Sequence, residues 1–303
     1  MPALADALAA GPVVLDGGLS TELESRGHDV SSALWSARLL RDDPAAVVAA
    51  HAAFAAAGAQ VATTASYQAT VEGFAARGVA ADEARRLIAS SVTLAREGQG
   101  EGWVAGSVGP YGAMLADGSE YSGAYVPEVG GAELRAFHRP RMALLAEAGA
   151  DVLACETVPA AAEAEALLAE AASLGVPVWL SLTTVLDEDG APRTRRGELA
   201  ADVYRMAAGV DEVLAVGVNC TAPAAVAATV AAAAAAGKPI VVYPNSGETW
   251  DAAARRWTGS PGIGPGAPSW IEAGARLVGG CCRVRPADVA AIATAVRGWA
   301  CRR

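Results

Sequence analysis

The sequence predicts one α/β domain over residues 1–303, in which eight parallel strands close into a (β/α)8 barrel, the TIM-barrel fold. Three observations predict it. Short apolar runs recur along the chain without alternating in polarity, which is typical of strands buried on both faces of a parallel sheet. Stretches with helical periodicity, such as 133–149 and 160–175, separate these runs, and several end at Gly, a common helix stop. The runs number eight, and 303 residues suit a barrel of about 250 residues with insertions.

The expected strands, in chain order, begin at residues 12, 59, 103, 151, 177, 214, 239 and 275. They read PVVLDGG, AQVATTAS, WVAGSVGP, DVLACETV, PVWLSLTT, LAVGVNCT, PIVVYPNS and ARLVGGCC. An open, doubly wound sheet is the alternative. No G-x-G-x-x-G follows the first strand, and the strand count matches closure, so we favour the barrel. The Gly- and Pro-rich stretch at 259–270 lies between the last two strands and introduces the final barrel unit rather than a second domain.

Composition argues against several classes of partner. The net charge is −10, Lys238 is the single lysine, and the arginines are scattered, so we expect no nucleic-acid partner. No apolar run is long enough to span a membrane. The N-terminal stretch MPALADALAAG has neither the basic region nor the cleavage pattern of a signal peptide, and we therefore expect a cytoplasmic protein.

Three of the five cysteines are expected at the carboxyl ends of barrel strands, where barrel enzymes place their active sites. Cys220 follows the sixth strand, and Cys281 with Cys282 follows the eighth, with only the seventh between them. Neighbouring residues of a regular strand point to opposite faces, so the chain must bend here, and Gly279 and Gly280 permit unusual dihedral angles and close backbone approach. Three thiolates leave one of zinc's four positions open, which is typical of a catalytic site.

Two other interpretations of the cysteines were weighed. Buried cysteine is often core filler, which is the better interpretation of Cys155 inside the fourth strand, and Cys301 is expected to be an exposed thiol near the C-terminus. A closed structural zinc site or a thiol sensor needs a fourth protein ligand. His28, His51 and His138 fall in a loop or in helical stretches, so we interpret all three as structural or surface residues.

The segments LDGGLSTELESRG, TTASYQAT, CETVP, GVNCTAP, YPNSGETWD and GGCCRV, in this order, resemble the zinc-dependent homocysteine S-methyltransferase family over nearly the whole chain. The resemblance implies a barrel that transfers a methyl group to homocysteine, giving methionine, with Zn²⁺ bound by Cys220, Cys281 and Cys282. The chemistry agrees with the cysteines. A free thiol, with a pKa of about 8.5, is mostly protonated at neutral pH, and zinc coordination removes that proton, so no side-chain base is required.

The remaining strand ends are expected to hold the amino-acid part of homocysteine. The resemblance assigns the ammonium group to Asp16 and Glu156, at the ends of the first and fourth strands. Gly17 and Gly18 present backbone N–H groups that could take the carboxylate.

Two further residues are site candidates. Tyr67 lies where related enzymes place a tyrosine near the metal, as a transient ligand when no thiol is bound. Asn219 either orients its neighbour Cys220 or contacts substrate.

The methyl donor is expected to be a sulfonium compound. The chain has no room for folate- and corrinoid-binding domains, and it lacks the C-terminal arm of betaine-type enzymes, so it resembles the short forms that use S-methylmethionine or S-adenosylmethionine. A betaine-type or other thiol or selenol methyltransferase on the same barrel is the alternative. The aromatic candidates for contact with the sulfonium cation are Tyr111, Tyr121, Tyr125 and Trp35. Without the arm we expect a monomer.

Overall fold

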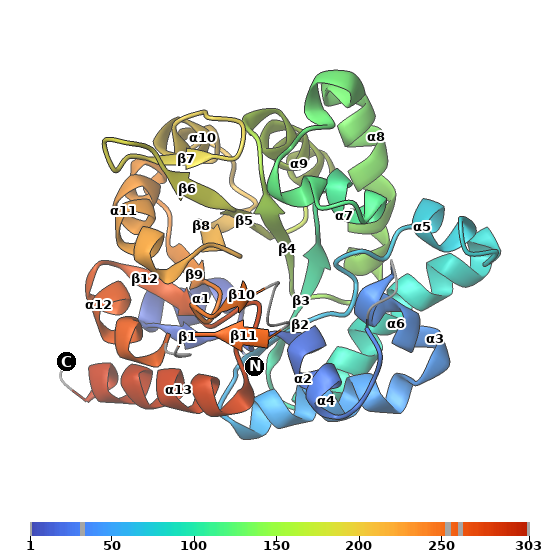
Figure 1. Ribbon diagram of the computed structural model, residues 1–303, viewed down its shortest axis with the longest axis horizontal. Helices are drawn as coiled ribbons and strands as arrows, with labels where there is room; N and C mark the ends of the chain where they lie inside the picture. Colours follow the sequence, from blue (N-terminus) through green and yellow to red (C-terminus); the bar gives the residue numbers. More distant parts are fainter. Residues whose placement is uncertain (1, 31–33, 252–255, 260–262, 302–303) are drawn as a thin grey trace.

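The computed structural model describes residues 2–30, 34–251, 256–259 and 263–301, and its centre is a ring of eight parallel strands (Figure 1). Around the ring the order is β1, β12, β9, β8, β5, β4, β3 and β2. A β-bridge between Leu15, just after β1, and Val61 of β2 joins the two ends of this order and closes the barrel. The strands are β1 (Val13–Val14), β2 (Val61–Thr63), β3 (Trp103–Val108), β4 (Val152–Val158), β5 (Val178–Leu182), β8 (Val213–Asn219), β9 (Ile240–Tyr243) and β12 (Ala275–Val278). The predicted barrel is confirmed, and the open doubly wound sheet is excluded.

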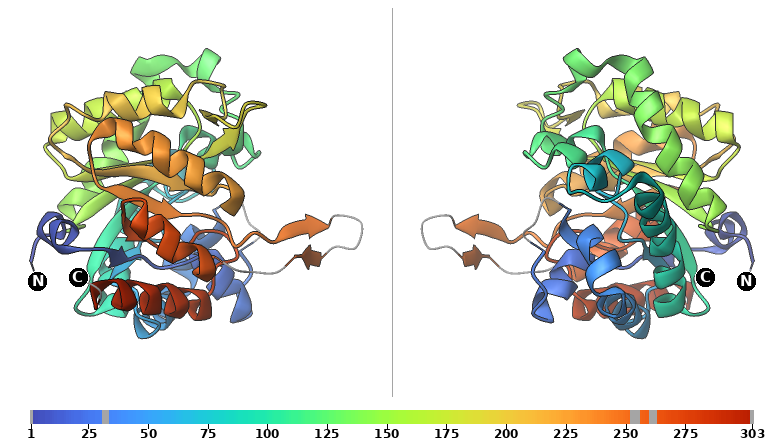
Figure 2. Two further views of the ribbon diagram at one scale, coloured as in Figure 1. Left: turned by 90° about the vertical axis from the view of Figure 1, so that its left-hand side faces the viewer. Right: turned by 90° about the vertical axis from the view of Figure 1, so that its right-hand side faces the viewer.

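Helices surround the ring on its outer side (Figures 1 and 2). Local signals explain their ends: the Asp43 side chain accepts the Ala46 N–H at 3.1 Å before Pro44 opens one helix, and left-handed Gly175 ends another. The longer helices are α4 (Pro44–Ala56), α6 (Ala81–Gln99), α8 (Val126–Glu147), α9 (Ala161–Leu174), α11 (Pro223–Ala233) and α13 (Pro286–Ala300). The shorter ones are α2 (Leu19–Ser25), α3 (Leu39–Asp42), α5 (Val71–Ala75), α7 (Tyr111–Leu115), α10 (Ala200–Met206) and α12 (Ala267–Glu272). None of the helices in the described ranges is long and apolar enough to cross a membrane.

The core has two layers. One lies between the strands and the helices, and the other fills the barrel interior, where the fully buried Trp179 donates its indole N–H to the Tyr243 hydroxyl at 2.9 Å. An N-terminal helix, α1 (Leu4–Ala10), packs Leu4 and Leu8 against this inner layer. Figure 2 shows α1 at the opposite end of the barrel from the hairpin that projects beyond the strand ends. This helix was not predicted from the sequence. It covers one end of the barrel interior, so a site can form only at the other end.

Two β-hairpins interrupt the expected alternation of strand and helix. The first, β6 (Thr184–Leu186) with β7 (Pro192–Thr194), follows β5. The second, β10 (Thr249–Asp251) with β11 (Arg256–Thr258), follows β9. Both lie on the carboxyl side of the barrel (Figure 2). Residues typical of turns form the turn of the first hairpin. The Asp187 carboxylate accepts the N–H groups of Asp189 and Ala191, and Gly190 has a φ of 79°.

Candidate metal centre and substrate pocket

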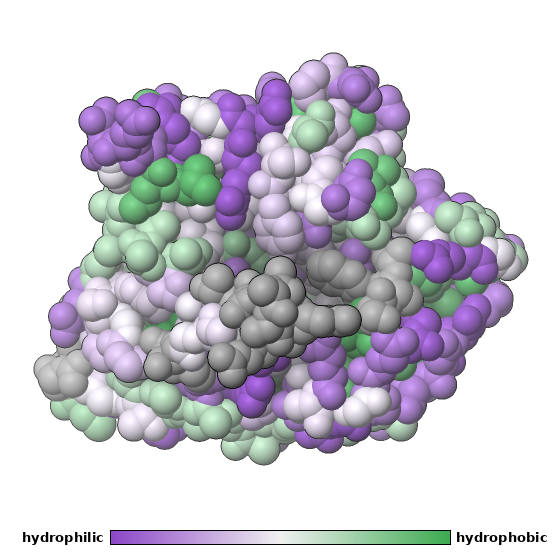
Figure 3. Space-filling view, in the orientation of Figure 1, coloured by the Kyte–Doolittle hydropathy of each residue, from purple (hydrophilic) through white to green (hydrophobic). Residues whose placement is uncertain are grey.

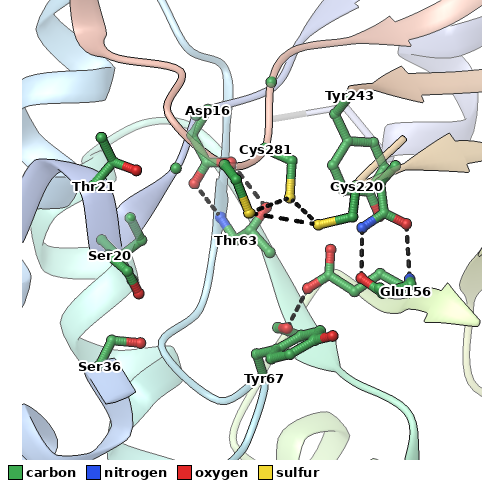
Figure 4. A pocket seen from close by; sticks show the side chains of 18 of the residues that line it. Asp16, Ser20, Thr21, Ser36, Thr63, Tyr67, Glu156, Cys220, Tyr243 and Cys281 are labelled. Carbon is green, nitrogen blue, oxygen red and sulfur yellow. Dashed lines mark hydrogen bonds between the residues drawn. The ribbon is translucent and has the colours of Figure 1, made fainter. Parts of the chain in front are cut away.

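A pocket with a cavity of about 140 Å³ lies at the carboxyl ends of the strands. Figure 3 shows this face of the molecule hollowed near its centre. Side chains from β1, β2, β4, β8, β9 and β12, or from the residues just after them, converge on one space in Figure 4. Every residue predicted for the metal and the homocysteine site lines this pocket: Asp16, Gly17, Gly18, Tyr67, Glu156, Asn219, Cys220, Cys281 and Cys282.

The three predicted metal ligands form a compact cluster of sulfur atoms. The Sγ of Cys220 lies 2.7 Å from that of Cys281 and 3.8 Å from that of Cys282, and the Sγ atoms of Cys281 and Cys282 are 4.0 Å apart. With zinc–sulfur bonds of about 2.3 Å, tetrahedral ligands sit about 3.8 Å apart. Two of the three separations therefore suit zinc directly, and the third must open by about 1 Å. Within the described ranges, no His, Asp or Glu joins the cluster as a fourth ligand.

The backbone brings these sulfurs together by two different means. A Cβ on Gly279 would lie 2.5 Å from the Leu15 Cβ, and one on Gly280 would lie 2.2 Å from a methyl carbon of Val284, so both positions require glycine for close packing. Neither glycine has a positive φ. The close backbone approach predicted at these glycines is confirmed, whereas left-handed conformations occur at Cys220, with a φ of 46°, and at Arg283, with a φ of 66°.

Two buried carboxylates face the same pocket. Asp16 accepts the N–H of Thr63 at 2.7 Å and its hydroxyl at 2.9 Å, and Glu156 accepts the hydroxyl of Ser107. Burial raises the pKa of each carboxyl to about 7, against the opposing effect of these hydrogen bonds. Among the described residues, no lysine or arginine forms an ion pair with either. A bound ammonium group would supply the missing positive charge.

Asn219, at the end of β8, is hydrogen-bonded to the ends of β4 and β5. Its Oδ1 accepts the Thr157 N–H at 2.7 Å and the Ser181 hydroxyl at 2.8 Å, while its Nδ2 donates to the Thr157 hydroxyl at 2.8 Å. Thr157, like Cys220, has a left-handed backbone, with a φ of 58°. Because the amide is engaged with protein groups, the geometry favours the orienting role for Asn219 over contact with substrate.

The two pocket glycines differ in the backbone donors that they offer. The Gly18 N–H donates to the Val284 carbonyl at 2.9 Å, so it is not available for a substrate carboxylate, contrary to the expectation. A Cβ on Gly17 would lie 2.7 Å from both a Phe54 ring carbon and the Val284 carbonyl oxygen. Gly17 thus remains the candidate donor, and a binding role for this turn stays a prediction.

Tyr67 is half-buried, but its phenolic oxygen is buried, and the residue lies near Cys220. Burial, and after it the Cys220 thiol, raises its pKa well above the usual range, so the phenol is protonated. The Arg141 guanidinium, itself buried, donates to the Tyr67 carbonyl at 2.9 Å and fixes the backbone there.

The aromatic candidates for the donor separate in space. Tyr121 lines the pocket, with its hydroxyl 4.0 Å from the Cys220 Sγ. Tyr111 does not line it; its ring packs 5.3 Å from that of Tyr125 and 4.8 Å from that of Phe137. The side chain of Trp35 lies outside the described part of the structure.

The other cysteines and the histidines lie away from the pocket, as expected. Cys155 is buried, which raises the pKa of its thiol to about 12, and Cys301 is exposed. His51 is buried on α4, where desolvation lowers its pKa to about 4. His138 is buried on α8 with its Nε2 2.9 Å from Glu163, and His28 lies 3.7 Å from Asp43.

Sequence reasoning missed two residues that support the Glu156 carboxylate. Ser107 comes from the end of β3 and Tyr243 from the end of β9, and both line the pocket. Their position at strand ends was the one signal available. A serine or tyrosine at such a position has no distinguishing pattern of its own.

Comparison with known proteins places the chain in a family. The family model described as homocysteine S-methyltransferase matches residues 13–296. The chain is 43% identical to the homocysteine S-methyltransferase YbgG of Bacillus subtilis, with 94% of each chain covered. It is 45% identical to the homocysteine S-methyltransferase of Escherichia coli, with 92% of this chain and 94% of that one covered. The metallated crystal structure of the Escherichia coli homocysteine methyltransferase MmuM superposes with a TM-score of 0.79 at 41% identity, covering 93% of this chain and 96% of that one. The chain therefore belongs to the homocysteine S-methyltransferase family.

Proposed function

We propose that this protein transfers a methyl group from a sulfonium donor to the sulfur of homocysteine and so forms methionine. One observation carries the proposal: three cysteine sulfurs, arranged for a metal, share a pocket with two buried carboxylates that have no cationic partner among the described residues. The same pocket can thus take a thiol at one end and an ammonium group at the other. Family membership supports this activity.

We assign the metal as zinc, held by Cys220, Cys281 and Cys282. Soft sulfur ligands suit zinc, and two sulfur–sulfur separations already fit its tetrahedral geometry. When bound, zinc would supply a Lewis acid that keeps the acceptor sulfur deprotonated at neutral pH. Asn219 would hold the backbone of Cys220 for this purpose. Tyr67, beside the cluster, would be the transient ligand when no thiol is present.

The acceptor is oriented by the protein's own side chains. Asp16 and Glu156 would bind the ammonium group, and its positive charge would favour their ionised forms. The Gly17 N–H is proposed to bind the carboxylate. Asp16, Glu156 and Cys220 are buried, whereas Cys281 and Cys282 are half-buried, so bound substrates would complete the shielding of the reacting sulfur from water. The positive charge of a sulfonium donor disappears as its methyl group is transferred to a thiolate, which suits a dry site.

The donor is proposed to be S-methylmethionine, with S-adenosylmethionine as a slower alternative. The protein is further proposed to act as a monomer built from one domain over residues 1–303. Steady-state rates of methionine formation at saturating homocysteine, measured with S-methylmethionine, S-adenosylmethionine, betaine and methyltetrahydrofolate, test the assignment. We expect the sulfonium compounds to react in that order and the other two not to react. Faster turnover with betaine would move the protein to the betaine-type branch, and no methionine from any donor would favour a structural zinc site or a thiol sensor.

A further inference from the structure

One arginine beside the pocket has no acidic partner in the part of the chain that the structure describes. Arg195 directly follows β7 of the first hairpin and is half-buried. Its Nη2 and Nε donate to the hydroxyl of Thr183 at 3.0 and 3.3 Å. No carboxylate of the described residues lies within 4.0 Å of its guanidinium, whereas Arg193, two residues earlier, forms an ion pair with Asp187. Acidic residues outnumber basic ones in this chain by 33 to 23, so a shortage of carboxylates does not explain the missing ion pair.

The position of Arg195 relates it to the metal centre. The Thr183 hydroxyl that accepts from Arg195 also donates to the backbone carbonyl of Cys220 at 3.2 Å. A single hydroxyl group therefore joins the guanidinium to a proposed zinc ligand. Burial lowers the pKa of the Arg195 guanidinium, and the nearby Tyr121 phenol and Cys220 thiol oppose this shift. Cys220 lines the pocket, whereas Arg195 and Thr183 do not, so the guanidinium lies next to the pocket, on the side of the β6–β7 hairpin.

We infer that Arg195 binds the α-carboxylate of the methyl donor. A guanidinium forms paired, charge-assisted hydrogen bonds with a carboxylate, and the Thr183 hydroxyl engages only part of its five N–H donors. In an amino-acid sulfonium the carboxylate carbon is four bonds from the sulfur, about 5 Å with bonds of about 1.5 Å. A donor whose methyl group approaches the cysteine cluster can thus place its carboxylate beside Arg195.

The charges also favour one orientation of the donor. The sulfonium end is attracted to the anionic cysteine cluster and repelled by Arg195, while the carboxylate end is attracted to Arg195 and repelled by Asp16 and Glu156. The acceptor's ammonium group is assigned to those two carboxylates, which leaves Arg195 for the second substrate. This inference rests on the proposed function and specifies the donor class: a sulfonium compound with a free carboxylate.

The test uses the zinc-loaded full-length protein, Arg195→Gln, Arg195→Lys and, as a matched control, Arg196→Gln on the exposed neighbouring arginine. KM and kcat are measured for S-methylmethionine and for its methyl ester, which lacks the negative charge. We expect Arg195→Gln to raise the KM for S-methylmethionine about tenfold to a hundredfold, with the KM for homocysteine changed less than twofold. Arg195→Lys should recover part of the loss, and Arg196→Gln should resemble the wild type.

The ester separates charge recognition from a general disturbance of the hairpin. The wild type should discriminate against the ester by about the factor lost in Arg195→Gln, and that variant should treat the two donors alike. An unchanged KM for S-methylmethionine in Arg195→Gln, a rise in the KM for homocysteine instead, or a wild type indifferent to the ester would each overturn the inference. If Arg195→Gln does not fold, the wild-type comparison of acid and ester still decides. Failure of the wild type to form methionine with any donor would instead refute the proposed function.

Discussion

A buried carboxylate outside the pocket, Glu163, differs from the two inside it, Asp16 and Glu156, in the number and kind of its hydrogen-bond partners. Outside the pocket, the Glu163 carboxylate accepts the Tyr111 N–H at 2.7 Å and the Tyr125 hydroxyl, and it lies 2.9 Å from the His138 Nε2. The other ring nitrogen of His138 faces Arg141 at 3.3 Å. Helices α8 and α9 and the loop after β3 therefore satisfy one another's polar groups.

Inside the pocket the carboxylates are less well supported. Asp16 accepts hydrogen bonds from the N–H and the hydroxyl of Thr63, and Glu156 is supported by Ser107 and Tyr243. Burial raises both pKa values to about 7, so each carboxylate is costly to ionise without a cation. A fully partnered buried carboxylate therefore stabilises the fold, whereas a buried carboxylate with few partners at the strand ends is arranged to bind a ligand.

The largest expected effect comes from the sulfur cluster beside the pocket carboxylates. Cys220→Ala, Cys281→Ala or Cys282→Ala should each strip zinc from the protein and abolish methionine formation, because two cysteines leave the metal under-coordinated. Metal analysis of the purified variants measures this, with exposed Cys301→Ala as the control that keeps one zinc per chain. Zinc and activity retained in the triple variant would place the metal elsewhere.

The next effect separates substrate holding from metal binding. Asp16→Asn and Glu156→Gln should each raise the KM for homocysteine about tenfold to a hundredfold, because an ammonium group loses a charged hydrogen-bond partner. Zinc content should stay at the wild-type value. If both variants keep the wild-type KM, the ammonium group is bound by other residues.

The thermal stability of the protein should also depend on pH through the two pocket carboxyls. The pKa values of Asp16 and Glu156 are about 7 in the folded protein and about 4 in the unfolded chain, so the folded state holds more protons between these values. Their contribution to stability is present below pH 4 and is lost as the pH rises through 7. Without substrate, the zinc-loaded wild type should lose more thermal stability between pH 5 and 8 than the Asp16→Asn/Glu156→Gln double variant. Parallel Tm curves would show that neither carboxyl is perturbed.

The smallest effect on activity is expected at Glu163, the buried carboxylate with a full set of hydrogen-bond partners. Tyr125→Phe removes one of the hydrogen bonds to Glu163 and should lower the free energy of unfolding by about 1–2 kcal/mol. Zinc content and the KM for homocysteine should not change, because Tyr125 does not line the pocket. Urea unfolding alongside steady-state kinetics makes the comparison. If the KM for homocysteine rose while the stability stayed unchanged, Tyr125 and Glu163 would belong to the substrate site.

Much of the barrel and its metal centre was predictable from the sequence. Strands buried on both faces read as continuous apolar runs, and all eight were found where expected. The carboxyl ends of parallel strands meet at one face, so Cys220, Cys281, Cys282, Asp16 and Glu156 could be brought together without knowing a single distance. Such inferences rest on period and polarity, which local sequence carries.

The tertiary structure decided what depends on contacts between distant segments. Tyr111, Tyr121 and Tyr125 lie in one stretch of chain, yet only Tyr121 reaches the pocket, because the other two pack in a cluster with residues of α8 and α9. The N–H of Gly18 is taken by Val284, more than 260 residues away. Arg195 gains its place beside Cys220 through Thr183 and a hairpin that the strand–helix alternation does not predict. Such partners are chosen by packing in three dimensions, and residue type and spacing along the chain do not encode them separately.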